Sequence, residues 1–137
     1  MLKKFISVTT VTAEPHEKDG EPGYELVFPH AGVRRWMSAK NFEKKYTEAP
    51  DNTSVTEDMV NNFIKDTEVF TIGEKTTVVK VTLINGFEIV ETSSCVDPAN
   101  YSEETGKEIC LDKIKNKIWD YLGFLLQTAL YGFRQED

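Results

Sequence analysis

Residues 75–94, KTTVVKVTLINGFEIVETSS, limit the fold more than any other part of the chain. The dipeptide Asn85-Gly86 joins two runs of apolar and β-branched residues, and it is typical of a type I′ hairpin turn, which requires positive φ at both central positions. Residues 68–72, EVFTI, predict a strand before this hairpin. We therefore expect an antiparallel meander of about three strands over 68–94. One face of its long strand carries Thr77, Val79, Val81 and Leu83. The other face carries Thr76, Val78, Lys80, Thr82 and Ile84.

A long helix is expected after the meander, starting at Thr105 or Gly106 and ending near Tyr131. From Ile118 onward, apolar residues occupy a wider arc of this helix than one sheet face can cover. This pattern predicts burial on two sides and therefore a dimer or a higher homo-oligomer. The apolar positions are Ile109, Ile114, Ile118, Tyr121, Leu122, Leu125, Leu126, Ala129, Leu130 and Phe133.

Shorter elements are predicted in the first half of the chain. Residues 4–13, KFISVTTVTA, are rich in β-branched residues and predict a strand. Residues 24–38 favour two short strands around a turn at 29–32, and Ser38 is placed to cap a helix over 39–46. The next helix is expected over 56–66, starting at Thr56, with apolar side chains at helical spacing.

Together these patterns predict an α+β protein, in which a long C-terminal helix packs on an antiparallel meander. A small β-hairpin and helix module precedes it. The polar residues 47–54, TEAPDNTS, have the composition of a linker. We therefore predict a module over 1–50 and a core domain over 51–137.

Charge and composition exclude several classes of partner. The net charge is −7, and residues 51–137 hold eight Lys and Arg against sixteen Asp and Glu. Such an acidic domain lacks the basic surface that DNA or RNA binding requires. The apolar runs are too short for a membrane span, and the start of the chain does not have the pattern of a secretory signal.

The two cysteines, Cys95 and Cys110, are too few for a disulfide framework and fit a reducing cytoplasm. No pair formed with His16 or His30 has zinc-like spacing, so we predict no metal and no cofactor. Cys95 could be a nucleophile, a metal ligand or a packing residue. A nucleophilic thiol needs a base, and both histidines lie far upstream. We therefore interpret both cysteines as packing residues, and no catalytic residue is predicted.

Other polar residues leave two interpretations open. Asp97, before Pro98, can cap a turn, or its carboxylate can accept hydrogen bonds from a ribose or a base edge. Lys113 and Lys117 lie on one helical face, either as a solvated face paired with Asp112 and Glu108 or as contacts to phosphate groups. Phe70 and Phe87 can belong to the core or stack on a base.

The string FTIGEKTTVVKVTLINGFEIVETSSCVDPANYSEETGKEI, with KIWDYLGFLL after it, resembles a small family of phage proteins. The resemblance covers residues 55–131. It rests on Gly73, Asn85-Gly86-Phe87, Cys95-Val96-Asp97-Pro98 with Asn100, the GKEI at 106–109 and the WDYLGF at 119–124. Residues 22–46 are similar to a separate small phage module.

The family resemblance implies a function. One branch is similar to the first Thoeris anti-defence proteins, which are homo-oligomeric sponges that bind cyclic ADP-ribose isomers, and some of them cyclic oligonucleotides, without cleaving them. It implies a nucleotide-binding, non-enzymatic counter-defence protein in the host cytoplasm. The alternative is an acidic phage protein that binds and inhibits a host protein and has no small ligand. The ligand-binding residues that the resemblance suggests are Phe70, Phe87, Asn85, Asp97, Asn100, Lys113 and Lys117.

Overall fold

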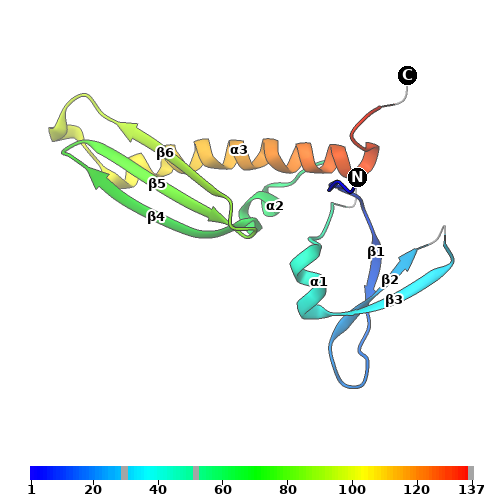
Figure 1. The fold of residues 1–137 in the computed structure, drawn as a ribbon. Coiled ribbons are helices and arrows are strands. Elements are labelled where there is room, and N and C mark those ends of the chain that lie inside the picture. The colour runs from blue at the N-terminus through cyan, green and yellow to red at the C-terminus, as the bar shows by residue number, and fades with distance from the viewer. Residues whose placement is uncertain (29–30, 51–52, 136–137) are drawn as a thin grey trace. The chain divides into compact units, whose positions relative to one another are not determined.

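The computed structural model of the chain describes residues 1–28, 31–50 and 53–135. These residues form two three-stranded antiparallel sheets and a long C-terminal helix, which confirms the predicted α+β class (Figure 1). The chain divides into two compact units, one of Met1–Asp51 with Leu126–Asp137 and the other of Asn52–Leu125. No helix in the described ranges is both long enough and apolar enough to cross a membrane.

The first unit contains a sheet with strand order β1-β2-β3 and one short helix. The Ser38 hydroxyl accepts a hydrogen bond from the Asn41 backbone N–H at 3.3 Å, so the predicted helix cap is confirmed. The helix packs on the sheet through the ring of Phe42, whose centroid lies 4.1 Å from that of Tyr24. Residues 29–30 of the predicted turn lie outside the described residues. The elements are β1 (Thr12–Pro15), β2 (Gly23–Phe28), β3 (Val33–Ser38) and α1 (Ala39–Lys45).

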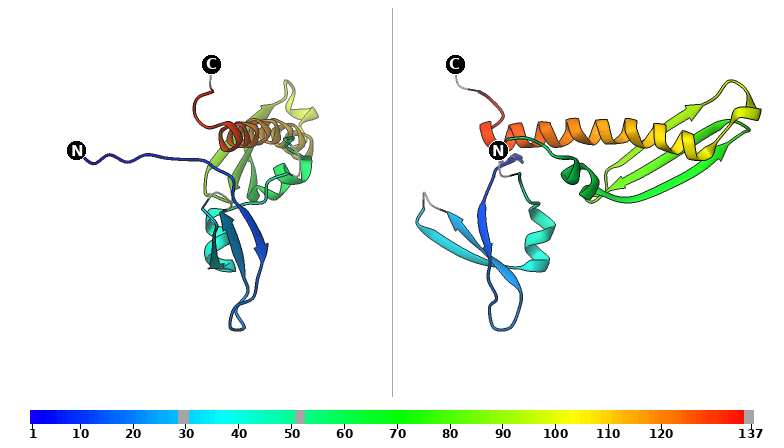
Figure 2. Two further views of the ribbon diagram at one scale, coloured as in Figure 1. Left: turned by 90° about the vertical axis from the view of Figure 1, so that its right-hand side faces the viewer. Right: turned by 180° about the vertical axis from the view of Figure 1, so that it is seen from behind.

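The strand predicted over 4–13 is mostly wrong. Only residues 12 and 13 of that range lie in β1, and residues before Thr12 form an extended chain without regular structure (Figure 2). A strand needs a hydrogen-bonding neighbour as well as a suitable composition. On the side of β1, the described part of β2 pairs with residues 12–15 only, so the residues before them have no neighbouring strand.

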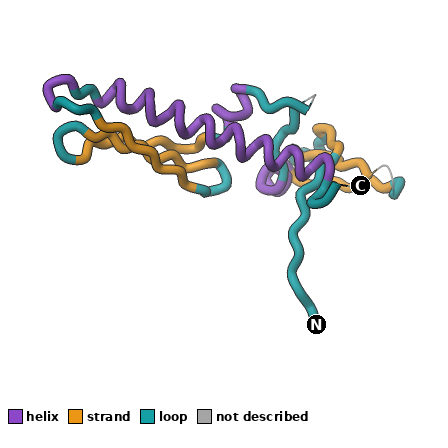
Figure 3. Tube along the Cα trace, turned by 90° about the horizontal axis from the view of Figure 1, so that it is seen from above, coloured by secondary structure: helices purple, strands orange, loops and turns teal. Residues whose placement is uncertain are grey.

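The second unit places one long helix along one face of a sheet with strand order β4-β5-β6 (Figure 3). The strands alternate as predicted, because Thr77, Val79 and Val81 all face the helix and are fully buried. The helix contributes Cys110, Ile114, Ile118 and Leu122 to the same core. The elements are α2 (Glu57–Asn62), β4 (Ile64–Ile72), β5 (Thr76–Leu83), β6 (Glu88–Ser94), the 3₁₀ turn η1 (Pro98–Asn100) and α3 (Glu103–Tyr131).

The hairpin lies where it is expected, but its turn is not of type I′. Gly86 has φ of 88°, whereas Asp19 is the only described non-glycine residue with positive φ. Asn85 therefore lacks the conformation that type I′ needs. The Gly86 N–H donates to the Leu83 carbonyl, and the Leu83 N–H donates to the Phe87 carbonyl. The loop is thus one residue longer, with the left-handed glycine as its last residue.

The helix predicted over 56–66 is shorter than expected. The Thr56 hydroxyl caps it as predicted, accepting from the Met59 N–H at 3.2 Å, but the helix ends at Asn62. The next residues belong to the sheet, because Ile64 pairs with Leu83 and the Ile84 N–H donates to the Phe63 carbonyl. Pairing with β5 therefore overrides the helical periodicity of the sequence.

The long helix starts at Glu103, two residues before the earlier of the two predicted starts, Thr105. It ends at Tyr131, as predicted. The Ser102 hydroxyl accepts a hydrogen bond from the Thr105 N–H at 3.2 Å, so Ser102 caps the first turn. Gly106 therefore lies inside the helix instead of opening it.

Candidate binding site

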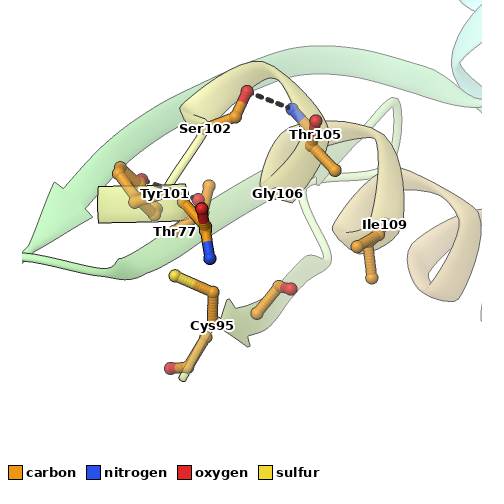
Figure 4. A pocket seen from close by; sticks show the side chains of 10 residues that line it. Thr77, Cys95, Tyr101, Ser102, Thr105, Gly106 and Ile109 are labelled. Atoms are coloured by element: carbon orange, nitrogen blue, oxygen red, sulfur yellow. Dashed lines mark hydrogen bonds between the residues drawn. The ribbon is translucent and has the colours of Figure 1, made fainter. Parts of the chain in front are cut away.

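A small pocket lies where β6 leads through η1 into the first turn of α3 (Figure 4). Its volume is about 120 Å³. Hydroxyl groups dominate its lining, so its walls can donate and accept several hydrogen bonds. The lining residues are Thr77, Ser93, Ser94, Cys95, Asn100, Tyr101, Ser102, Thr105, Gly106 and Ile109.

A chain of hydroxyl groups fixes one wall of the pocket. The Tyr101 hydroxyl lies 2.7 Å from Thr77 Oγ1 and 2.8 Å from Thr71 Oγ1. Thr71 Oγ1 donates its proton to the Glu103 carboxylate at 2.6 Å. A hydroxyl has one proton, so Tyr101 donates to Thr71, and Thr77 donates to Tyr101. The three protons therefore point in sequence toward Glu103, which holds the Tyr101 ring in place.

Gly106 allows the first turn of α3 to lie against β5. A Cβ atom at this position would collide with the Thr77 side chain, with Oγ1 as the nearest atom. Thr77 is completely buried, so it has no room to move aside. The missing side chain of Gly106 thus brings helix and strand together at the pocket.

Cys95 borders the pocket and is half-buried. Its thiol donates to the Asp97 carbonyl at 3.3 Å, and its N–H donates to the Lys75 carbonyl at 3.2 Å. The side chain therefore holds the end of β6 to the loop that follows. Cys110 is completely buried in the core, and burial raises the pKa of its thiol. Its predicted packing role is confirmed.

Two of the predicted ligand-binding residues lie beside the pocket. Asn100 is part of its lining. Asp97 Oδ1 accepts a hydrogen bond from the Ala99 N–H at 2.9 Å, so its carboxylate caps η1. Of the two interpretations of Asp97, capping is the role visible in the fold.

Asn85 and Phe87 lie at the opposite end of β6, in the hairpin loop. Asn85 Oδ1 accepts from the Phe87 N–H at 3.0 Å. The Phe87 ring meets the edge of Tyr121 with centroids 5.8 Å apart, and it remains 55% exposed. Residues 88–92 of β6 separate this loop from the pocket, a span of roughly 20 Å between Phe87 and Ser93. A single chain therefore does not bring these two groups together.

Phe70, Lys113 and Lys117 occupy further places outside the pocket. Phe70 pairs with Val78 and faces away from α3, with 46% of its surface exposed. Lys113 Nζ donates to the Thr92 carbonyl at 3.1 Å. Both lysines extend from α3 toward β6.

Lys117 forms an ion pair with Glu91. The hydrogen bond between them raises the pKa of the Lys117 ammonium and lowers the pKa of the Glu91 carboxyl. Both groups are therefore charged near neutral pH. The acidic partner of Lys117 is therefore Glu91 of β6 in place of the predicted Asp112 or Glu108 of its own helix, and Lys113 bonds a backbone carbonyl.

The hydroxyl residues that form most of the pocket were not among the predicted ligand-binding residues. Ser93-Ser94 ends the last strand, and Ser102-x-x-Thr105-Gly106 opens the last helix. That second pattern is a signal for a helix N-terminus, and it could have been recognised. In the described part of the chain, no three His, Cys, Asp or Glu side chains gather in the manner of a metal site. Four residues were considered as metal ligands, Cys95, Cys110, His16 and His30. Of these, His30 lies outside the described residues.

Comparison with known proteins gives one match. Residues 55–130, which run from the start of α2 almost to the end of α3, match the model of the phage protein (N4 Gp49/phage Sf6 gene 66) family. No curated protein and no solved structure matches the chain. The matched residues include the whole pocket.

Proposed function

Because the chain belongs to the phage protein (N4 Gp49/phage Sf6 gene 66) family, we propose that it is a counter-defence protein that sequesters a nucleotide second messenger in the host cytoplasm. The messenger is a cyclic ADP-ribose isomer or a cyclic oligonucleotide. The protein binds it without cleaving it and acts as a homo-oligomer.

The observation that carries this proposal is the hydroxyl-lined pocket at the first turn of α3. Free N–H groups at a helix N-terminus and the helix dipole favour anions, and serine and threonine hydroxyls donate to phosphate oxygens. The Ser102 hydroxyl accepts from the Thr105 N–H, so its own proton remains able to donate. A phosphate or ribose group of the messenger binds here.

The size of the pocket supports a site completed by a second copy. Pockets for small ligands measure about 300–1,000 Å³. The pocket of one chain, at about 120 Å³, accepts one phosphate or ribose group and not a complete cyclic nucleotide. The rest of the ligand then contacts a partner copy, whose Asn85 and Phe87 are exposed for that role.

Non-catalytic binding fits the chemistry of the pocket residues. The Tyr101 hydroxyl is committed to Thr71, and the Cys95 thiol to the Asp97 carbonyl. A nucleophile needs an adjacent base that accepts its proton. The two candidate nucleophiles, Tyr101 and Cys95, have a hydroxyl group and a carbonyl group as hydrogen-bond partners instead of a base. A messenger bound here would stay intact, as a sponge requires.

Calorimetric titration with cyclic ADP-ribose isomers, cyclic dinucleotides and cyclic trinucleotides tests the proposal. We expect sub-micromolar binding of one class and recovery of the ligand intact after denaturation. Asn100→Asp adds a negative charge at the pocket and should weaken binding about tenfold or more, equal to about 1.4 kcal/mol. Asn116→Asp is the matched control, because it makes the same change at an exposed position of α3 and should bind normally.

Three outcomes would contradict the proposal. They are silence across the whole panel, recovery of a cleaved ligand, and equal binding by the Asn100→Asp and Asn116→Asp variants.

One observation favours a second candidate function, inhibition of a host protein. The face of the β4-β5-β6 sheet that points away from α3 exposes Phe70, Ile72 and Val90. Exposed apolar side chains on one face are typical of protein interaction surfaces. Retention of a host protein by the wild type, its loss in Val90→Glu and no nucleotide binding would favour this second function.

A further inference from the structure

The N-terminal arm, residues 1–11, has the composition of a strand but pairs with none. Within the described part of the chain, its residues make no hydrogen bond and no ion pair. Its large side chains are open to solvent, with Phe5 89% and Ile6 80% exposed. An exposed segment of this kind gains free energy by pairing with the edge of a sheet.

The chain offers such an edge in β4. The strand order β4-β5-β6 leaves one side of β4 without a neighbour. After a register shift near Lys65, residues 66–72 pair regularly with β5. Phe70 and Ile72 on this strand are about half exposed, so a further strand could cover them.

Other sheet edges fit the arm less well. At the β6 edge, the Lys113 ammonium already occupies the Thr92 carbonyl oxygen. The β3 edge carries Arg34 and Arg35, whose charges repel those of Lys3 and Lys4 in the arm. β4 carries Asp66 and Glu68 instead, which attract them.

We propose that the N-terminal arm of one copy adds as a strand to the β4 edge of a second copy. The two sequences match in parallel orientation, because in each the charged residues come before an apolar pair, Phe5-Ile6 in the arm and Val69-Phe70 in β4. In that register Leu2 lies opposite Asp66, Lys4 opposite Glu68, and Ile6 opposite Phe70. These pairs share the sheet face away from α3, while Phe5 joins Val69 on the other face.

The partner is a second copy, because the exposed apolar side chains of α3, Trp119 among them, are typical of a surface that another copy covers. If each copy donates its arm and receives the other, the contact is reciprocal and closes as a symmetric dimer. The pairing needs no nucleotide, and the arm lies outside the hydroxyl-lined pocket. An experiment that contradicts the arm pairing therefore leaves the proposed function untouched, and the reverse also holds.

Charge exchange tests the pairing directly, with the mass in solution measured by light scattering or sedimentation. The wild type should be a dimer or a higher oligomer. Lys3→Glu with Lys4→Glu should dissociate it, because position 4 then repels Glu68 opposite it, and position 3 adds a second negative charge next to Asp66 and Glu68. Adding Asp66→Lys and Glu68→Lys should restore the wild-type mass. Lys44→Glu with Lys45→Glu on α1 is the matched control and should leave the mass unchanged.

A disulfide trap identifies the contact itself. One chain carries Ile6→Cys and a size tag, the other carries Phe70→Cys, and both carry Cys95→Ala. After mild oxidation we expect a tagged-untagged disulfide on a non-reducing gel, and little of it when Val90→Cys replaces Phe70→Cys. A monomeric wild type, an unchanged mass after the lysine reversal, or equal linking to both positions would overturn the pairing.

Discussion

Gly106 and Gly123 lie on the same helix but in different surroundings. A Cβ atom at Gly106 would collide with the buried Thr77, whereas a Cβ atom at Gly123 meets no atom within 4 Å. Glycine costs roughly 1 kcal/mol relative to alanine inside a helix. At Gly106, close packing against β5 offsets this cost. At Gly123, no close contact among the described residues offsets it.

The same substitution should therefore have opposite effects at the two glycines. Gly106→Ala should lower the free energy of unfolding by about 1–2 kcal/mol, because overpacking costs more than the helix gains. Gly123→Ala should raise it by about 0.5–1 kcal/mol. Urea denaturation measures both changes. Equal shifts of the same sign would show that Thr77 and Gly106 are not in close contact.

The two cysteines differ in the exposure of their thiols. Cys110 is buried with a raised pKa, so little of it is thiolate near neutral pH, and a reagent cannot reach it. Cys95 is half-buried at the surface of the pocket. We expect a thiol reagent to label one group per native chain quickly and the second only after unfolding. Cys95→Ala should abolish the fast phase, and rapid labelling that persists in that variant would contradict the packing.

At the scale of elements, the contact between β6 and α3 is partly polar. Lys117 and Lys113 of the helix bind Glu91 and the Thr92 carbonyl of the strand. The core side chains below them are apolar or thiol groups, with the buried Thr77 at one end of the layer. The ion pair therefore lies at the rim of the packed layer, where it fixes the position of the helix along the strand.

The Glu91–Lys117 pair should make stability depend on pH on the acid side. The lowered pKa of Glu91 means that its contribution is complete above the ordinary value of 4.5 and is lost as pH falls through the lowered value. The contribution is small, because Lys117 is partly exposed and solvent screens the pair. The difference in Tm between the wild type and Glu91→Gln should be constant from pH 7 to 5 and shrink below it.

Glu88→Gln is the control for that measurement. It removes the ion pair with Lys80 on the opposite face, where the Glu88 side chain is 56% exposed. Solvent screens such a pair, so its effect on Tm should be smaller at every pH. A larger effect for Glu88→Gln would show that the Glu91–Lys117 pair does not stabilise the contact between β6 and α3.

For the whole molecule, the proposals share one physical basis, which is that a single chain leaves groups without partners. The pocket is too small for a nucleotide, the N-terminal arm has the composition of a strand but no neighbour, and Trp119 and Leu130 of α3 are each 42% exposed. The wide apolar arc of this helix gave the prediction of a homo-oligomer. A second copy would cover such groups, and measurement of the mass in solution addresses this directly.

The sequence by itself determined the elements whose signals are local. Alternation along β5 divided its residues between two faces, Asn85-Gly86 located the hairpin, and Ser38 and Thr56 marked two helix starts, because these features depend on neighbouring residues. Only the tertiary structure decided what depends on distant residues. The end of α2 follows from pairing with β5, and the position of Gly106 from contact with Thr77.

The same distinction holds for the candidate site. Asn100 beside the pocket was predicted, whereas Asn85 and Phe87 lie at the far end of β6 and Lys117 is paired with Glu91. The strand composition of residues 4–11 was recognisable, but a strand forms only beside another strand. Sequence pattern specifies which face or conformation a segment favours, and tertiary packing decides which partner it meets, because contact energies depend on residues far apart in the chain.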